Sequence, residues 1–490
     1  MRLRDSYSLF LWVALALVPL MPSSDSIWVD EAQTWGYAHL NTLADWKTKI
    51  TSDNHSESQM PLGMFSAWVG ARLLGTSEWA MRAPNMLWAA GTILIFAALG
   101  RALQQPFLTL LLAVQPYLWF YTNEARPYAL QIFSGAVLLY GLYQAIQLKL
   151  RGNIWAIVLG TGSVLACASS MLGLFSTIPA ILILFYYIHK ERWHITKVSL
   201  AICAIFSAAL LPLGFYYWSK LSQGAGGAKI WKVGISNLAY SCLEFSGFAG
   251  LLPARQVLRA LARNSESVWP SVPPRIFLAA FLISFFLLMV IWLIKSRRQL
   301  SDWSKSCLFF FVASFSLLWL VATVVHFPFW GRHLAASFPA YICLIGAFLG
   351  YLWSKGLGGR ALVIAFFISL TTSSLLLRFS PDHAKDDYRG AAHWLLNHSK
   401  QGETIWWAAD SLGGTYYKIF SLNLDESPSI PSLHIMNPDL ARLETVAFPK
   451  FVALSKLDLY DAHGAIQQWV KTNSFQQVAS FQSFTIWAHP

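Results

Sequence analysis

Charged residues are scarce in this sequence, and their scarcity argues against an ordinary soluble protein. Only 12% of the 490 residues are charged, whereas a soluble globular chain carries about 25%. Acidic residues are the scarcer kind, with 24 Asp and Glu against 36 Lys and Arg. Hydrophobic residues make up 56% of the chain, so we expect most of it to lie in a membrane.

Cysteine is also rare, and its spacing excludes a cysteine-bound metal. Four of the five cysteines fall within apolar runs and one in a loop, so we expect no disulfide: Cys167, Cys203, Cys307, Cys343 and Cys242. A folded basic domain is missing as well, so the net charge of +12 does not indicate a nucleic-acid partner. Most cations stand in short loops between apolar runs, the arrangement that orients membrane proteins.

Eleven apolar runs are long enough to cross about 30 Å of hydrocarbon. They cover residues 7–24, 84–101, 106–122, 127–148, 153–170, 172–189, 195–217, 275–294, 304–325, 334–353 and 360–378. No convincing small-x-small cleavage site follows the first run. We therefore expect a retained span rather than a signal peptide, with Arg2 and Arg4 in the cytoplasm.

A shorter apolar stretch, residues 61–75, decides the expected topology. If it crossed the membrane, every later basic loop would lie outside. If it lies on the membrane surface as a helix, those loops lie inside, as the positive-inside rule demands. We therefore expect a polytopic α-helical membrane protein with about eleven spans, a cytoplasmic N-terminus and an external C-terminus.

Three pieces then share the outer face: loop 25–83, loop 218–274 and the tail 379–490. The tail alternates helical patterns (DDYRGAAHWLLNHS, DAHGAIQQWVKT) with strand-like runs (ETIWWAA, KFVALSKL, FTIWAH). We expect residues 1–378 to form a transmembrane domain and residues 379–490 a small periplasmic α/β domain.

Two adjacent acids, Asp30 and Glu31, stand where the first span leaves the membrane on its outer side. Neighbouring side chains on a helix point about 100° apart, so the two carboxylates cannot share one role. One can face a cavity while the other braces a neighbour or a cation. The alternative is that Asp30 only begins a helix and favours its dipole.

Arginines mark the spans that enter the membrane from the outer side. Four of the five entries carry one: Arg82, Arg126, Arg275 and Arg332. Pro127 suits a first helical position and leaves Arg126 extended, so the guanidinium and free helix N–H groups can face one anion. A single outer arginine is explained as well by snorkelling to lipid headgroups. Several together indicate a phosphate held at the outer leaflet.

Loop 218–274 contains a basic amphipathic pattern that is typical of a headgroup-binding surface helix. Its stripe of cations consists of Arg255, Arg259 and Arg263. The sequence GAGGA at 224–228 lacks the GK[ST] ending of a phosphate-binding loop and indicates a hinge or flexible loop instead.

The polar tract at residues 53–61 offers candidate ligands for a divalent cation. These are Asp53, His55 and Glu57. Three such residues in a polar loop are more often simply solvated, so the metal requirement stays open and no cofactor is assigned.

Acids at an outer mouth, arginines for a phosphate and a lipid setting together indicate sugar transfer from a polyprenyl phosphate. The donor phosphate would lie among the arginines, with its lipid tail between spans. One carboxylate would take the proton of an acceptor hydroxyl, a contribution of about 10²–10⁴-fold to the rate. The leaving group is already a phosphate, so arginine charge replaces a general acid.

Five motifs follow one another along residues 7–400: VDEAQTW, PLGMFSAWVGARLLGTSEWAMRAPN, NEARPYAL, GRHLAASFPA and KDDYRGAAHWL. Their order resembles that of the GT-C fold glycosyltransferases, which are membrane-embedded and use lipid-phosphate sugars. The resemblance is nearest to the protein O-mannosyltransferases and the bacterial aminoarabinose transferases, a group like glycosyltransferase family 39. It implies a GT-C-like catalytic transmembrane domain and an inverting transfer.

The resemblance also implies roles for individual residues. It makes Asp30 the catalytic base and Glu31 a supporting group. It places Arg126 and Arg332 near the donor phosphate, and the side chains beside them are Glu124, Tyr128 and His333.

One tract departs from the family pattern. Relatives usually carry Lys or His followed by two prolines where this chain has Gln59, Met60 and Pro61. A cationic contact with phosphate or substrate is missing there, and His55, slightly upstream, is a candidate substitute.

Two other functions stay open. A lipid-linked substrate transporter or flippase would carry ionisable residues near mid-membrane, whereas here they collect at the outer rim. An inactive lipid-binding scaffold of envelope assembly is the third reading, because of the altered tract. The expected partners are a polyprenyl-phosphate sugar, membrane lipids and an acceptor that is a glycolipid, polysaccharide or protein. The expected location is the bacterial inner membrane with a periplasmic active site.

Overall fold

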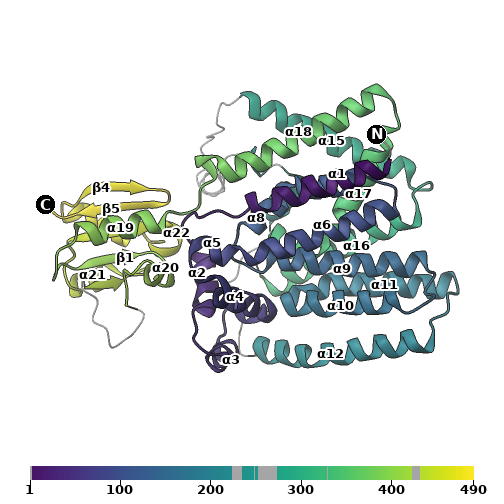
Figure 1. Cartoon of the computed structure of the whole chain (residues 1–490). Helices are drawn as coiled ribbons and strands as arrows, with labels where there is room; N and C mark the ends of the chain where they lie inside the picture. The colour runs from purple at the N-terminus through teal and green to yellow at the C-terminus, as the bar shows by residue number, and fades with distance from the viewer. Residues whose placement is uncertain (1–2, 223–233, 248, 252–272, 328, 422–430) are drawn as a thin grey trace. The chain divides into compact units, whose positions relative to one another are not determined.

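A computed structural model describes residues 3–222, 234–247, 249–251, 273–327, 329–421 and 431–490 (Figure 1). By packing, the chain divides into two compact units. Unit 1 consists of Met1–Ser23, Asn41–Leu73 and Arg82–His383, and unit 2 of Ser24–Leu40, Leu74–Met81 and Ala384–Pro490. Two short segments from the first hundred residues therefore fold with the C-terminal part of the chain.

The described part of unit 1 is helical. Its α-helices are α1 (Leu3–Leu17), α3 (Leu43–Ser52), α4 (Pro61–Leu74), α6 (Pro84–Ala102), α7 (Phe107–Ala113), α8 (Pro116–Thr122), α9 (Tyr128–Gln147), α10 (Ile154–Ser169), α11 (Leu174–Lys190), α12 (Lys197–Ser222), α13 (Ile235–Ser246), α15 (Pro273–Ser296), α16 (Asp302–Val325), α17 (Phe338–Trp353) and α18 (Leu357–Phe379). Short 3₁₀ turns join them: η1 (Val18–Leu20), η2 (Ser56–Gln59), η3 (Met171–Gly173), η4 (Gly331–Ser337) and η5 (Pro381–His383). Helices α6, α9 and α10 pack side by side (Figure 1), and the apolar core lies among them and α17.

Many of these helices have the length and composition of membrane spans. Within the described residues seven segments qualify: Glu78–Ala102, Tyr128–Gln147, Met171–Lys190, Lys197–Ser222, Asp302–Val325, Gly331–Trp353 and Leu357–Phe379. Three further expected spans are shorter apolar helices, Tyr7–Leu20, Ile154–Ser169 and Ala280–Ser296. The protein is a multi-pass helical membrane protein, as expected from its sequence.

The expected span over residues 106–122 is divided into two short helices. It consists of α7 and α8, separated by Val114 and Gln115. Pro116 begins α8 and holds Gln115 in an extended conformation. The carbonyl of Val114 accepts a hydrogen bond from the Ser374 hydroxyl at 2.8 Å, so a backbone group released by the break has a partner.

The short apolar stretch at 61–75 forms the fourteen-residue helix α4. This helix is too short to be among the candidate spans. Its end is exposed, with Leu73 at 77%. Its location on the outer surface stays a prediction, as does the orientation of the whole chain.

Unit 2 contains the expected small α/β fold. Its helices are α2 (Val29–Ala38), α5 (Glu78–Arg82, which ends one residue into unit 1), α19 (Tyr388–His398), α20 (Ser411–Tyr416), α21 (Leu440–Thr445), α22 (Leu457–Tyr460) and α23 (Ala465–Thr472). Its strands are β1 (Ile405–Ala408), β2 (Ser432–His434), β3 (Phe451–Ser455), β4 (Gln476–Phe481) and β5 (Phe484–Ala488). The predicted strands correspond to β1, β3 and β5, and the predicted helices to α19 and α23, so the α/β prediction is confirmed.

The sheet has the order β2-β1-β3-β5-β4. Strands β2, β1 and β3 are parallel to one another, with Ile405 opposite Phe451. Strand β5 is antiparallel to both of its neighbours, β3 and β4. Strands β1 and β3 are buried along their whole length, as the continuous apolar runs IWWA and FVALS require for central strands. The carboxyl ends of β2, β1 and β3 therefore meet at one edge of the sheet.

Candidate active site

The two acids of the opening motif lie on α2 and have different surroundings. Trp28 is the N-cap and Val29 the first helical residue, so Asp30 lies in the first turn and does not cap the helix. Its charge still favours the helix dipole. Asp30 is half-buried, whereas Glu31 is 0% exposed. Of the two carboxylates, only Asp30 has the exposure needed to meet an acceptor molecule.

Glu31 is held by groups of the protein itself. One carboxylate oxygen lies 2.8 Å from the Lys385 Nζ. The other accepts from the Trp28 N–H at 3.5 Å, which is long for such a bond. The Lys385 side chain is only 11% exposed, so this is a buried ion pair. These contacts suit a supporting group rather than one that exchanges protons with a substrate.

In unit 1, Arg126 faces a carboxylate. Its guanidinium lies 2.7 Å from a carboxylate oxygen of Glu57, and both side chains are nearly inaccessible to water. Buried charges are normally paired in this way. The pair joins η2 to the segment just before α9.

The tract that offered metal ligands does not gather around one point. Glu57 pairs with Arg126, whereas a carboxylate oxygen of Asp53 lies 2.6 Å from the His55 Nδ1. Gln59 is the last residue of η2. Among the residues that the structure describes, no three His, Cys, Asp or Glu side chains are grouped so as to hold a metal ion.

Arg332 and His333 lie on η4, next to the start of α9. The Arg332 guanidinium is 5.9 Å from the centre of the Tyr128 ring, a cation–π distance. The His333 Nδ1 lies 3.3 Å from the Trp330 N–H, which fixes the ring beside the turn. Tyr128 follows Arg126 by two residues, so the fold brings together the two motifs that were expected to share the donor phosphate. The carbonyl of Glu124 accepts from the Asn85 amide.

The other outer arginines have different places. Arg82 is 0% exposed and donates to the Ser23 carbonyl at 2.9 Å and to its hydroxyl at 3.2 Å. These contacts bind Arg82 to the segment that follows η1, besides any part in donor binding. Arg275 lies in the first turn of α15. Two features of the sequence lie outside the described residues, the stripe Arg255, Arg259 and Arg263 and the GAGGA segment.

Glu244 is a further acid at this place that sequence reasoning missed. It comes from α13 and accepts from the Tyr121 hydroxyl at 3.3 Å. A Cβ added to Gly331 would lie 2.4 Å from its carboxylate, so Glu244 packs directly against η4. No motif surrounds it in the sequence, and its position follows only from the fold.

Gly135 lets α9 approach η4 closely, and we expect the stability of the protein to depend on this contact. A Cβ at Gly135 would lie 2.0 Å from the Ala336 carbonyl oxygen, a backbone atom that cannot move aside alone. We expect Gly135→Ala to lower the free energy of unfolding by about 1–3 kcal/mol.

Gly214→Ala is the matched control, because nothing lies within 4 Å of its added Cβ. Alanine there should be neutral or stabilise the helix by up to about 1 kcal/mol. Thermal unfolding in one detergent compares the two variants. Equal stability of both would show that the close contact of Gly135 is not needed.

The helical unit and the small mixed sheet define a class of membrane protein, the GT-C fold. The chain is similar to ArnT from Cupriavidus metallidurans in the apo state, with a TM-score of 0.56, 11% identity and 99% and 97% of the two chains covered. It is also similar to the oligosaccharyltransferase AglB from Archaeoglobus fulgidus, with a TM-score of 0.51, 12% identity and 99% and 74% covered. The expectation of a GT-C fold is confirmed. Neither the family models nor the curated protein sequences give a match.

Proposed function

We propose that this protein is a membrane glycosyltransferase that moves a sugar from a polyprenyl-phosphate donor to an acceptor hydroxyl. The observation that carries the proposal is the contrast between Asp30 and Glu31 on a chain with the GT-C fold. Asp30 is half-buried and Glu31 is buried against Lys385. This is the division between a reacting base and its support that the chemistry needs.

In the proposed step the acceptor oxygen attacks the anomeric carbon of the sugar. Asp30 takes the hydroxyl proton as the new carbon–oxygen bond forms. The bond between the anomeric carbon and the phosphate oxygen breaks, with inversion, and its electron pair leaves with the polyprenyl phosphate. Arg126 and Arg332 stabilise the charge that grows on this phosphate, so no general acid is needed.

The comparisons support a lipid-linked donor of this class. The AglB structure holds a dolichol-phosphate and an inhibitory peptide. A long polyprenyl tail also suits a chain whose described helices include seven candidate spans. We place the protein in the bacterial inner membrane, with the cytoplasmic N-terminus and periplasmic unit 2 that the positive loops indicate. The acceptor is a glycolipid, a polysaccharide or a protein.

Transfer by the purified full chain in lipid nanodiscs tests the proposal. The donors are undecaprenyl-phosphate sugars with a radiolabelled sugar, and the acceptors are an envelope lipid extract, surface polysaccharide and periplasmic protein. We expect label in one acceptor class and release of undecaprenyl phosphate. Mass spectrometry of envelopes from cells with and without the gene should show the same product missing.

Transport provides the contrary outcome. If no donor is consumed, but a fluorescent lipid-linked sugar becomes accessible on both sides of proteoliposomes, the protein moves the lipid rather than the sugar. Binding of polyprenyl phosphate with neither transfer nor movement would identify an inactive scaffold. Either result would overturn the proposed function.

A further inference from the structure

Helix α2 rests on the C-terminal α/β fold, within unit 2. The usual ligand-binding edge of an open α/β sheet is formed by the carboxyl ends of its parallel strands. Asp410 follows β1 and accepts from the Gln33 side chain of α2 at 3.2 Å. Lys456 follows β3, and its Nζ lies 5.0 Å from the centre of the Trp28 ring. This edge of the sheet therefore holds the helix that carries Asp30.

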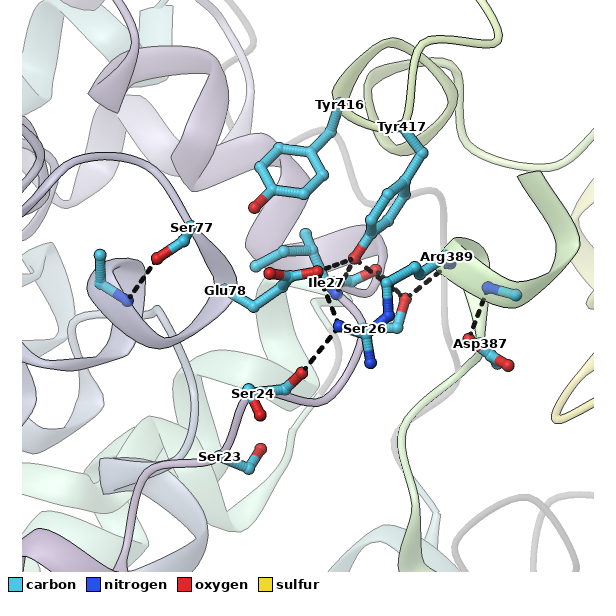
Figure 2. A network of polar contacts seen from close by, with 12 residues as sticks. Ser23, Ser24, Ser26, Ile27, Ser77, Glu78, Asp387, Arg389, Tyr416 and Tyr417 are labelled. Carbon is cyan, nitrogen blue, oxygen red and sulfur yellow. Dashed lines mark hydrogen bonds and ion pairs between the residues drawn. The ribbon is translucent and has the colours of Figure 1, made fainter. Parts of the chain in front are cut away.

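A second set of bonds fixes the segment leading into α2, as Figure 2 shows. The Tyr417 hydroxyl accepts from the Ile27 N–H at 2.7 Å and donates to Glu78 at 3.2 Å. The Arg389 guanidinium lies 3.2 Å from the same Glu78 carboxylate oxygen, and the Arg389 N–H donates to the Ser26 hydroxyl at 3.0 Å. These bonds join all three chain segments of unit 2.

Within α2, the Glu31 carboxylate lies 2.8 Å from the Lys385 Nζ. Lys385 stands three residues before α19, and its neighbour Asp386 pairs with Lys456 at 2.6 Å. Lys385, which precedes α19, thus contacts Glu31, and Lys456, which follows β3, contacts Trp28, the N-cap of α2. Both targets flank Asp30 in the sequence, so their contacts limit the rotation of the first helical turn.

We propose that the C-terminal α/β fold holds the catalytic helix and that Lys385 is a positioning residue, which acts on Asp30 through Glu31. The inference rests on the proposed function, because it takes Asp30 as the base. Lys385 neutralises the buried Glu31 carboxylate and fixes its direction. Asp30, the preceding residue on the same turn, is thereby aimed at the acceptor hydroxyl. Loss of such alignment costs about 10²-fold in rate when reacting atoms shift by about 1 Å.

The test compares Lys385→Met, Lys385→Arg and the control Lys471→Met in the full chain. Lys471 is an exposed lysine of the same α/β fold, at the end of α23. We expect Lys385→Met to lower the single-turnover rate per bound donor by about 10²-fold. Donor stoichiometry and affinity should stay unchanged. Arginine should restore most of the rate, and Lys471→Met should behave as the unmodified protein.

A double variant identifies the route of the effect. If Lys385 acts through Glu31, Lys385→Met combined with Glu31→Gln should be no slower than the slower single variant. Multiplied losses would mean that Lys385 does not work through Glu31, and would overturn the inference. A merely structural role would lower the fraction of protein that binds donor, without changing the rate per bound donor.

Amide hydrogen exchange over residues 26–38 gives a readout that does not depend on transfer. Lys385→Met should speed exchange in this segment, whereas Lys385→Arg and Lys471→Met should not. Unchanged exchange and unchanged rate would overturn the inference, as would faster exchange with an unchanged rate. If Asp30→Asn itself transfers normally, the assignment of the base fails. In that case faster exchange in Lys385→Met would still show that the contact of Lys385 with Glu31 stabilises α2.

Discussion

Replacing Asp30 by asparagine is expected to slow sugar transfer by about 10²–10⁴-fold, with donor affinity changed by less than about twofold. An amide cannot accept the proton of the acceptor hydroxyl, while its size and its place in the first turn of α2 are kept. The measurement is single-turnover transfer beside donor binding, in purified protein. Near-normal turnover of this variant would rule out Asp30 as the base.

Two variants control this experiment. Asp439→Asn changes an exposed carboxylate in the same unit that makes no side-chain cap bond, so it should have no effect. Glu31→Gln should be milder than Asp30→Asn, because glutamine can still accept from the Trp28 N–H and bond to Lys385. If the Glu31 variant is slower than the Asp30 variant, Glu31 is the base and Asp30 the supporting group.

Regular patterns in the sequence predict much of this fold. Apolar runs located the helices, and the runs IWWA and FVALS located the buried central strands of the sheet. The spacing on a helix predicted that Asp30 and Glu31 would meet different surroundings, and their exposures differ accordingly. Each of these features leaves a local signal, since it depends on a run of neighbouring residues.

Contacts between distant segments could not be predicted in the same way. Lys385 meets Glu31 across 354 residues, and Tyr417 meets Ile27 across 390. Each of these contacts depends on one or two single polar side chains, which leave no periodic pattern. The packing of Glu244 against η4 is of the same kind. The break at Pro116 did have a local signal, but the apolar run around it was read as one span.

Replacing Arg126 by alanine is expected to have the second-largest effect. It removes a proposed donor-phosphate contact and also the ion-pair partner of the buried Glu57. Removing one partner of a buried pair costs about 3–5 kcal/mol in stability. Arg126→Lys keeps the charge but removes the bidentate fork, so it should lower turnover more than donor affinity.

Glu57→Gln separates the two roles of Arg126. It removes the same ion pair but keeps the guanidinium, so donor binding should survive in this variant even if stability falls. If Arg126 only braces Glu57, the two variants will lose donor affinity and stability alike. Donor titration and thermal unfolding, measured on the same samples, distinguish these outcomes.

Arg332→Ala tests the second arginine that we propose binds the donor phosphate. Its guanidinium lies 5.9 Å from the centre of the Tyr128 ring, so alanine removes this cation–π contact together with the proposed phosphate contact and should weaken donor binding. Arg72→Ala is the control, because Arg72 makes a similar contact with Trp68 at 5.3 Å on α4. If both arginines hold one phosphate, the combined loss in Arg126→Ala with Arg332→Ala will differ from the product of the single losses. Losses that simply multiply would mean that the two guanidinium groups act on separate parts of the donor.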